Sequence, residues 1–442
     1  MTMSSRRPRM TVLLALAGIG AASLTACGSS GGPPAAVPSG SVAAAATNLS
    51  KCDPAKSALS LTTGAQGVAA VNVAVKEMAA KYPGLKINVT ASKSTHYPDL
   101  TQEVVSDIAV GKTPDIIMSG LNYLRFWVDQ YHPAPIDPAA LPSGYRKQFL
   151  PAGTVDGKVY LAPFQVSLPV LLVNTDLLRQ AGVSPSTSIT TYAQLVTTAQ
   201  AVTAKTGKPS VNLSTDRLGD WFAQALVQGA GGTFAAPDGA AAFNTAVGQQ
   251  ALGLWGTLAK DKVLLPIGYL DGFAQFEAGK LPFFFAASSY ISQALSGIGS
   301  KFSWKAQELP ALTTQGAGDA PSGGNGWVVL SQDSCRAAYA NMMVGLMLGK
   351  DASLAASGAG YSYIPVNSDA AASLLSSSDV PSQLRFAWTY AKPLTSWDAF
   401  KGNNIGPIIQ ALTDMASKLQ GGAPNGSTVN SAVTQINDLE KG

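Results

Sequence analysis

The chain has 442 residues, 46% apolar and 13% charged, so it has the composition of a globular protein with enough apolar side chains for a large core. This length exceeds what one core usually holds and predicts two or three domains. The formal charge is +4, but without three arginines near the N-terminus 27 basic residues face 26 acidic ones. This balance excludes the strongly basic surface that nucleic-acid binding requires.

The first 27 residues have the pattern of an export signal. Three arginines are followed by the apolar residues 10–22, too few to span a membrane comfortably, and by Leu-Thr-Ala-Cys at residues 24–27. These last four residues resemble the lipobox of bacterial lipoproteins, which implies that Cys27 carries a lipid. The alternative is an ordinary signal peptide with a coincidental cysteine. Residues 28–49 are mostly small residues and proline, and we expect a flexible tether.

The next part of the chain alternates between strand and helix patterns. Strands are predicted over residues 59–62, 85–91 and 116–119, and helices over residues 68–82 and 97–108. This alternation predicts an α/β lobe with a mostly parallel sheet. Such sheets bind ligands beyond the carboxyl ends of their strands, so Tyr97 and the loop of residues 119–123, with Asn122, are candidate site residues.

Residues 156–182 contain the motif around which the chain is organised. Two apolar runs, residues 159–163 and 169–173, are separated by a break at residues 164–167 and followed by a helix that ends at Gly182. This order predicts two strands joined by a narrow crossing. The stretch resembles the crossing segment of extracellular solute-binding proteins of sugar-type ABC importers, which leads from one lobe to the other across a ligand cleft.

Later segments resemble the same family and follow in the expected order. Further helices are predicted over residues 191–206, 220–229, 243–260 and 337–348, and a strand over residues 281–286. Residues 322–330 resemble the family's return crossing, and residues 360–366 resemble its Gly-Tyr-Leu-Pro-Val element with two extra residues. Either Tyr361 or Tyr363 therefore takes the binding position. The resemblance covers residues 55–440.

The resemblance implies an α/β, two-lobed periplasmic-binding-protein fold like that of maltose-binding protein, with a cleft between the lobes and a hinge of crossing strands. The implied first lobe comprises residues 50–165 and 326–366, and the second comprises residues 166–325 and 367–442. A monomer of this kind closes on its ligand and presents it to a membrane permease with a cytoplasmic ATPase. The lipid on Cys27 would hold it at the outer face of the cell membrane.

Two cysteines, Cys52 and Cys335, remain besides Cys27. Outside the cytoplasm such a pair is either bonded or consists of two buried thiols. The resemblance favours the disulfide, because it assigns both segments to the same lobe.

Within the family, several phrases resemble binders of glycerol 3-phosphate and glycerophosphodiesters, among them residues 163–171 and 287–289. By that resemblance Tyr97, Ser167, Ser289 and Gly324 line the cleft with Trp221 and Tyr361 or Tyr363, and Asn122, Trp397 and Lys401 complete the candidate ligand-binding set. Two departures oppose a phosphate ligand. Leu121-Asn122 replaces an acidic residue, and Phe400-Lys401 replaces an arginine, whose bidentate guanidinium suits phosphate better than a lysine.

Tryptophans can provide flat faces for the C–H surface of a neutral polyol, although each can equally be a core residue. The sequence therefore favours a carbohydrate or other polyhydroxy ligand, with glycerol 3-phosphate or a glycerophosphodiester as the alternative.

An enzyme would need a reactive constellation, and the chain has only two histidines, His96 and His132, without metal-ligand spacing. Two carboxylates paired by the fold, as in a glycosidase, are the remaining enzymatic alternative. A structural or adhesive lipoprotein is the third, but it does not need strands that cross between two lobes. We expect a binding protein without catalytic activity, metal or cofactor.

Overall fold

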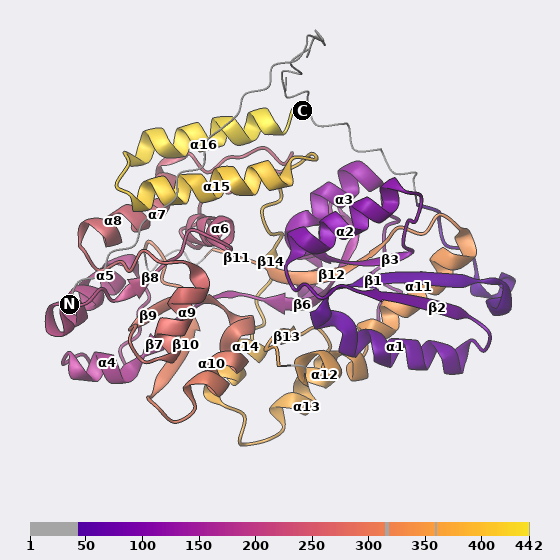
Figure 1. The fold of residues 1–442 in the computed structure, drawn as a ribbon, viewed down its shortest axis with the longest axis horizontal. Coiled ribbons are helices and arrows are strands. Elements are labelled where there is room, and N and C mark those ends of the chain that lie inside the picture. The colour runs from indigo at the N-terminus through magenta and orange to yellow at the C-terminus, as the bar shows by residue number, and fades with distance from the viewer. Residues whose placement is uncertain (1–42, 314–317, 359, 442) are drawn as a thin grey trace, which may run out of the picture. The chain divides into compact units, whose positions relative to one another are not determined.

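The computed structural model describes residues 43–313, 318–358 and 360–441 (Figure 1). The predicted export signal, including Cys27, and most of the predicted tether lie outside the described residues. The described chain forms two main sheets with helices packed on each. Within it we find no helix that is both long and apolar enough to cross a bilayer.

The first sheet has six strands. In spatial order they are β13 (Ile364–Pro365), β6 (Leu161–Ser167), β12 (Gly323–Val329), β3 (Ile116–Gly120), β1 (Ala58–Thr63) and β2 (Lys86–Ala91). The strand β1 pairs in parallel with β2 and β3, as predicted. The other three pairings are antiparallel, so the prediction of a mostly parallel sheet was wrong. The reason is that β6, β12 and β13, which the alternating pattern of residues 59–119 does not include, join the same sheet.

Helices cover the first sheet, and short elements connect its strands. The helices are α1 (Val68–Lys81), α2 (Tyr97–Ala109), α3 (Leu124–Tyr131), α11 (Ser334–Met347), α12 (Lys350–Gly358) and α13 (Ser368–Leu375). The short elements are η1 (Leu49–Lys51), η2 (Pro54–Lys56), η3 (Ala65–Gly67), η4 (Leu121–Tyr123), η5 (Lys147–Gly153), β4 (Thr154–Val155) and β5 (Lys158–Val159). In α1, Ala70, Val71, Ala74 and Met78 form one buried face, and α1 packs on α11 and α12.

The second sheet has the strand order β10 (Trp304–Glu308), β7 (Pro169–Asn174), β9 (Phe283–Ala287) and β8 (Val211–Asn212), and β11 (Ala320–Pro321) pairs separately with β14 (Leu394–Thr395). Its helices are α4 (Thr175–Gln180), α5 (Tyr192–Thr206), α6 (Gly219–Gly229), α7 (Ala246–Leu252), α8 (Leu254–Lys260), α9 (Tyr269–Glu277), η6 (Ser288–Tyr290), α10 (Ile291–Ile298), α14 (Ser382–Trp388), α15 (Ile405–Gln420) and α16 (Asn425–Leu439). One helix was expected over residues 243–260, but the structure has two. Thr245 caps the first of them, and Gly253, a poor helix former, separates them.

The chain crosses between the sheets from β6 to β7. Residues 164–167, predicted to be a break, instead continue β6, and every residue of both strands is buried. Polar side chains can be buried in these strands because they form hydrogen bonds within the protein. For example, the side-chain amide of Gln165 donates to the backbone carbonyl of Gln66 over 2.9 Å. The return crossing is β12, which lies between β6 and β3 (Figure 1).

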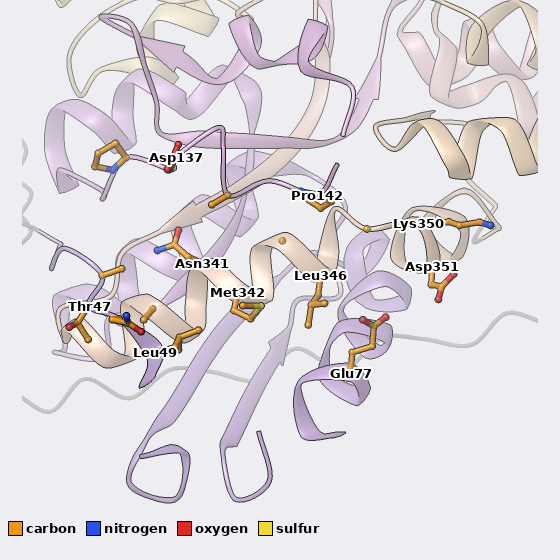
Figure 2. A pocket seen from close by; sticks show the side chains of 17 residues that line it. Thr47, Leu49, Glu77, Asp137, Pro142, Asn341, Met342, Leu346, Lys350 and Asp351 are labelled. Atoms are coloured by element: carbon orange, nitrogen blue, oxygen red, sulfur yellow. The ribbon is translucent and has the colours of Figure 1, made fainter. Parts of the chain in front are cut away.

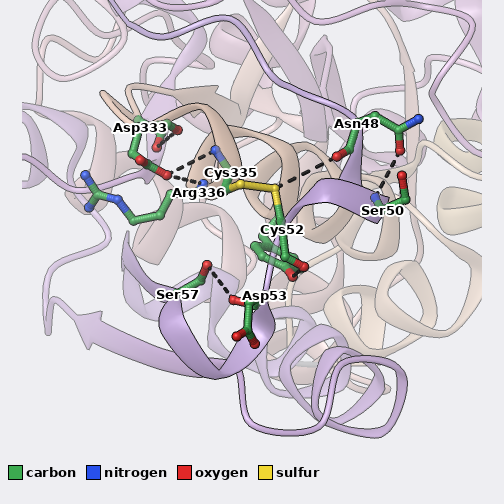
Figure 3. The surroundings of a disulfide bond; sticks show 10 residues. Asn48, Ser50, Cys52, Asp53, Ser57, Asp333, Cys335 and Arg336 are labelled. Atoms are coloured by element: carbon green, nitrogen blue, oxygen red, sulfur yellow. Dashed lines mark hydrogen bonds between the residues drawn. A yellow bond between two sulfur atoms is a disulfide. The ribbon is translucent and has the colours of Figure 1, made fainter.

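Cys52 and Cys335 form a disulfide that closes a sequence separation of 283 residues (Figure 3). Cys335 lies in the first turn of α11, where the side chain of Asp333 accepts hydrogen bonds from the amides of Cys335 and Arg336. The preceding segment is also attached, since the amide of Ala44 donates to the carbonyl of Ser331 over 2.8 Å. The start of the described chain is therefore tied to α11 and to the residues just before it.

Candidate ligand-binding site

Four polar side chains from the first sheet and its connections form a cluster, which we call the phenol–amide cluster: Tyr97, Gln165, Asn325 and Tyr363. The side-chain amide of Asn325 donates to the hydroxyl of Tyr97 over 3.2 Å and to the side-chain oxygen of Gln165 over 2.9 Å. The hydroxyls of Tyr97 and Tyr363 lie 3.5 Å apart. Gln165 and Asn325 are almost fully buried. These residues come from α2, both crossing strands and the loop before β13.

Local backbone geometry positions this cluster. The pairing of β12 with β6 shifts register between Asn325 and Gly326, a β-bulge that re-aims side chains. Gly324 has φ +108°, and a Cβ there would lie 1.8 Å from the carbonyl oxygen of Gln165, so only glycine fits. Tyr97 is the first residue of α2, shortly after β2 ends. Tyr97 therefore lies beyond the carboxyl end of a parallel strand, and its role in ligand binding stays a prediction.

The tyrosine hydroxyls of the cluster keep their protons. Burial raises the pKa of Tyr97, and its hydrogen bond with Tyr363 offsets part of this rise. Burial, followed by the neighbouring Tyr97, raises the pKa of Tyr363 well above its ordinary value. Both hydroxyls are therefore available as neutral donors and acceptors.

Two carboxyl groups on the second-sheet side, Asp220 and Asp398, form what we call the acid pair. Asp220 is 2% exposed and Asp398 is fully buried. Burial raises the pKa of Asp220 to about 6, and burial followed by the charge of Asp220 raises the pKa of Asp398 well above its usual range. The two groups interact closely enough to share a proton. The indole N–H of Trp397 donates to Asp220 Oδ2 over 3.0 Å.

Close contacts join the acid pair to the crossing strands. The rings of Trp221 and Trp397 lie 5.7 Å apart between centroids. A Cβ on Gly323 of β12 would come within 2.8 Å of Trp221 Cζ2 and 2.6 Å of Ser167 Oγ. Trp221, which follows Asp220 in α6, thus lies directly against both crossings.

The first-sheet side reaches the acid pair through η4, which follows β3. Burial, and then the charges of Asp220 and Asp398, raise the pKa of Tyr123 in this turn. Its neighbour Asn122 is close to Tyr97, since a Cβ on Gly120 would lie 2.7 Å from Asn122 Oδ1 and 2.6 Å from Tyr97 Cγ. The phenol–amide cluster and the acid pair therefore belong to one polar region between the two sheets.

The chain's family follows from its sequence, because the pattern of bacterial extracellular solute-binding proteins matches residues 73–382, more than half of its length. The chain belongs to this family. The prediction made from the crossing segment is confirmed, and the family places this solute-binding protein outside the cytoplasm.

Three known proteins show how far the likeness extends. A lactose-binding protein from Rhizobium radiobacter is 25% identical over 279 residues, which is 60% of this chain and 63% of that protein, so the chain spans less than two thirds of that relative. The cyclic alpha-maltosyl-1,6-maltose binding protein of Arthrobacter globiformis matches with a TM-score of 0.74 at 20% identity, covering 87% of this chain and 99% of its own. UgpB from Mycobacterium tuberculosis, whose structure was solved with glycerophosphocholine, matches with a TM-score of 0.67 at 15% identity, covering 86% of this chain and 97% of its own. These structures confirm the predicted two-lobed, maltose-binding-protein-like fold class.

Most sequence-predicted ligand residues of the solute-binding protein come together. Contacts join Tyr97, Asn122, Ser167, Trp221, Gly324, Tyr361, Tyr363 and Trp397 to the polar region. Ser289 is attached through its carbonyl, which accepts from the amide of Ser362 between the two tyrosines over 3.2 Å. Both tyrosines remain candidates because their ring centroids are 5.9 Å apart. The roles of all these residues in binding stay predictions.

Lys401 differs from the other candidates. Among the described residues, the neighbours that we find for it are Gly239 and Glu440. A cation that acts on Tyr290 is the exposed Arg217: burial raises the pKa of Tyr290, and Arg217 opposes that rise. Sequence reasoning did not single out Arg217.

Other residues of the polar region were also missed. Gln165 lay in the presumed break, although a polar residue between apolar runs is itself a signal of a buried hydrogen bond. Asn325, between two glycines of the return crossing, gave the same signal. Asp220 and Asp398 each adjoin a candidate tryptophan in sequence, but their burial depends on tertiary packing and is not readable from spacing.

A groove of about 810 Å³ lies elsewhere, along α11 and the segment of residues 46–49 (Figure 2). Its lining includes Asn341, Met342 and Leu346 of α11, and Glu77 of α1. No residue of the phenol–amide cluster or the acid pair lines it. We therefore assign the candidate site to the polar region, where the predicted residues meet. Over the described chain, no group of three or more metal-ligating side chains is found.

Proposed function

We propose that this solute-binding protein is the substrate-binding component of an ABC importer and captures a carbohydrate or other polyhydroxy solute. Family membership supports the binding role, and the names of the lactose-binding relative and the A. globiformis structure support a sugar. Capture would occur by rotation of the predicted lobes, residues 50–165 with 326–366 and residues 166–325 with 367–442, about the crossing strands. The closed form would be delivered to a membrane permease.

The observation that carries the choice of solute is a set of buried oxygens that lack partners in the polar region. Asn325 Oδ1 is one, and its orientation is fixed because the amide nitrogen already donates to Tyr97 and Gln165. The carboxyl oxygens of Asp398 are others, apart from the proton that Asp398 shares with Asp220. Buried acceptors without donors are costly unless a ligand satisfies them. Sugar hydroxyls can donate to these oxygens, and a sugar carries more of them than the glycerol part of a glycerophosphodiester, whose ionised phosphate oxygens only accept.

The placement of cations supports the same choice. A phosphate-bearing ligand needs several charge-assisted donors. Lys401 has Glu440 as its neighbour, and burial raises the pKa of Glu440 to about 7 with Lys401 opposing the rise. Arg217 is exposed, and the acid pair would repel an anion. The glycerophosphodiester alternative therefore has less support from the site than from the resemblance.

Calorimetry against monosaccharides, disaccharides, glycerol 3-phosphate and glycerophosphocholine tests the proposal. We expect sugars to bind, and Asn325→Ala to weaken binding at least about tenfold, since a lost buried hydrogen bond costs roughly 1–3 kcal/mol. Lys401→Ala is the matched control and should leave sugar affinity unchanged. Binding of only the phosphate-bearing compounds, weakened by Lys401→Ala or Arg217→Ala, would replace the sugar with a phosphodiester.

We also propose that lipid on Cys27 anchors the protein to the outer face of the membrane. The lipobox-like residues 24–27 support this. Wild-type protein should fractionate with membranes, and Cys27→Ala should not. Equal membrane content of both would contradict anchoring by this cysteine.

The enzymatic alternative gains a specific candidate, because the fold does pair two carboxyl groups. Glycosidase carboxyl groups stand about 5 to 9.5 Å apart, which leaves room for the reacting carbon or a water. The acid pair is close enough to share a proton, so it does not leave that room. We therefore propose binding without turnover, and hydrolysis of a bound glycoside that is lost in Asp220→Asn would overturn it.

A further inference from the structure

The acid pair lies where an α-helix and a loop are locked together. Asp220 is in the first turn of α6, and Asp398 lies in the loop before α15. Gln224 of α6 holds this loop by two bonds: its side-chain oxygen accepts from the amide of Asp398 over 2.8 Å, and its amide donates to the carbonyl of Ser396 over 2.8 Å. The position of the two carboxyl groups is thus built into the fold.

No cation in the described part of the chain pairs with the charge that remains when the two groups share one proton. None of the ion pairs found there includes Asp220 or Asp398. The groups that lower the pKa of Asp220 are neutral donors, such as the indole N–H of Trp397. Buried carboxylates without a cation are strongly unfavourable. Their presence in a binding region points to a positive group that arrives from outside.

The backbone beside the pair is strained. Asp398 has φ +59° and Ala399 has φ +62°, in the left-handed region that residues other than glycine seldom adopt. Such conformations persist where the surrounding structure enforces them, commonly at ligand sites. Here the strain accompanies a buried side chain whose oxygens have no hydrogen-bond partner apart from the proton shared with Asp220.

Aromatic side chains surround the carboxyl groups and suit a cation. The rings of Trp221 and Trp397 pack beside Asp220, and Tyr123 approaches both carboxyl groups from η4. The faces of aromatic rings attract ammonium groups and also cover the C–H surface of a sugar. The same surroundings therefore fit both parts of an aminated sugar.

We propose that the acid pair binds a protonated primary amine, so that the solute is an aminated carbohydrate rather than a neutral one. This inference rests on the proposed carbohydrate-binding function and specifies its ligand. An –NH₃⁺ group has three N–H donors, which match the acceptor positions of Asp398 that the shared proton leaves open. A hydroxyl has one donor and no charge, so it leaves the buried charge uncompensated.

The test uses matched sugars with the full mature protein: glucose, glucosamine and N-acetylglucosamine; galactose and galactosamine; cellobiose and the β1,4-linked glucosamine disaccharide. In each set that binds, we expect the amine to bind at least about tenfold more tightly than its neutral counterparts in calorimetry. Asp398→Asn should remove this preference, and the exposed Asp414→Asn should retain it. Because Asn keeps the shape of the side chain, the neutral sugar's affinity in Asp398→Asn reports whether the site is intact.

Four outcomes are decisive. A preference for the amine that is lost in Asp398→Asn supports the inference. If neutral or N-acetylated sugars bind as well as the amine, the inference is wrong and the carbohydrate proposal still stands. The same conclusion follows if the preference for the amine survives in Asp398→Asn. If only glycerol 3-phosphate or glycerophosphocholine binds, or if no sugar binds, both the proposed function and this inference are wrong.

Discussion

The ligand-free protein should lose stability as the pH rises, because of the acid pair. The pKa of Asp220 is about 6 in the folded protein and 3.8 ordinarily. Between these values the folded state holds a proton on Asp220 that the unfolded chain has lost, so the contribution of Asp220 to stability is complete below about pH 4 and is lost by about pH 6. The more strongly raised pKa of Asp398 extends the loss of stability to higher pH. A shift of about two units corresponds to roughly 3 kcal/mol at about 1.4 kcal/mol per unit.

Asp398→Asn should remove most of this decline. Asparagine does not titrate, so the part of the decline that comes from the strongly raised pKa of Asp398 disappears, while burial still raises the pKa of Asp220. We expect the thermal midpoint at pH 7.5 to rise by about 5 °C or more relative to wild type, and the two proteins to converge at pH 4.5. The exposed Asp414→Asn is the control and should follow wild type at every pH.

Thermal melts at several pH values between 4.5 and 7.5 measure this effect. Glu440 contributes a trend of the same sign, but it is present in every variant, so the difference between the melts isolates the acid pair. Parallel curves for wild type and Asp398→Asn across the whole range would refute the reasoning that burial holds a proton on the pair.

Three further results are expected. Gly324→Ala should abolish soluble expression or lower the thermal midpoint sharply, because its Cβ would overlap the carbonyl of Gln165. Reduction of the Cys52–Cys335 bond should lower the free energy of unfolding by up to about 5 kcal/mol in the chain-entropy treatment, and the thermal midpoint with it, while Cys335→Ala should be insensitive to reductant. Glu440→Gln should raise the midpoint at pH 8 and not at pH 5, because burial raises the pKa of Glu440 to about 7 and its ionisation then destabilises the folded state; equal effects at both pH values would contradict this.

Much of the fold could be predicted because local patterns and packing agree. The helix predicted over residues 68–82 is α1 (Val68–Lys81), and the strand predicted over residues 116–119 is β3 (Ile116–Gly120). The direction of the added strands could not be predicted in the same way. Whether β12 pairs parallel or antiparallel with β3 depends on contacts between segments some two hundred residues apart, about which a local hydrophobic period carries no information.

The residues of the candidate site also differ in how far they could be predicted from the sequence. Tyr97 and Trp221 were predictable because aromatic residues at the beginning of helices after strands are visible in sequence. The acid pair could not be predicted, since Asp220 and Asp398 are far apart in the chain. They are brought together by tertiary packing, in which Gln224 of α6 hydrogen-bonds to the loop that contains Asp398. The role of Lys401 stays a prediction: it was singled out by its position in the sequence, and the neighbours found for it are Gly239 and Glu440.

The attachment of the first described residues determines how the protein responds to a force that pulls on its N-terminal side. A pull on the N-terminal side of the chain passes the hydrogen bond of Ala44 and then meets the covalent bond at Cys52 before it can stretch β1. That bond passes the force to α11, which packs on α1, β1 and β12. Tension is therefore taken up by the first sheet and its helices, and β7, β9 and the rest of the second sheet lie outside the force path. If Cys27 carries the proposed lipid, a pull from the membrane would therefore act on the first sheet without displacing the second half of the protein.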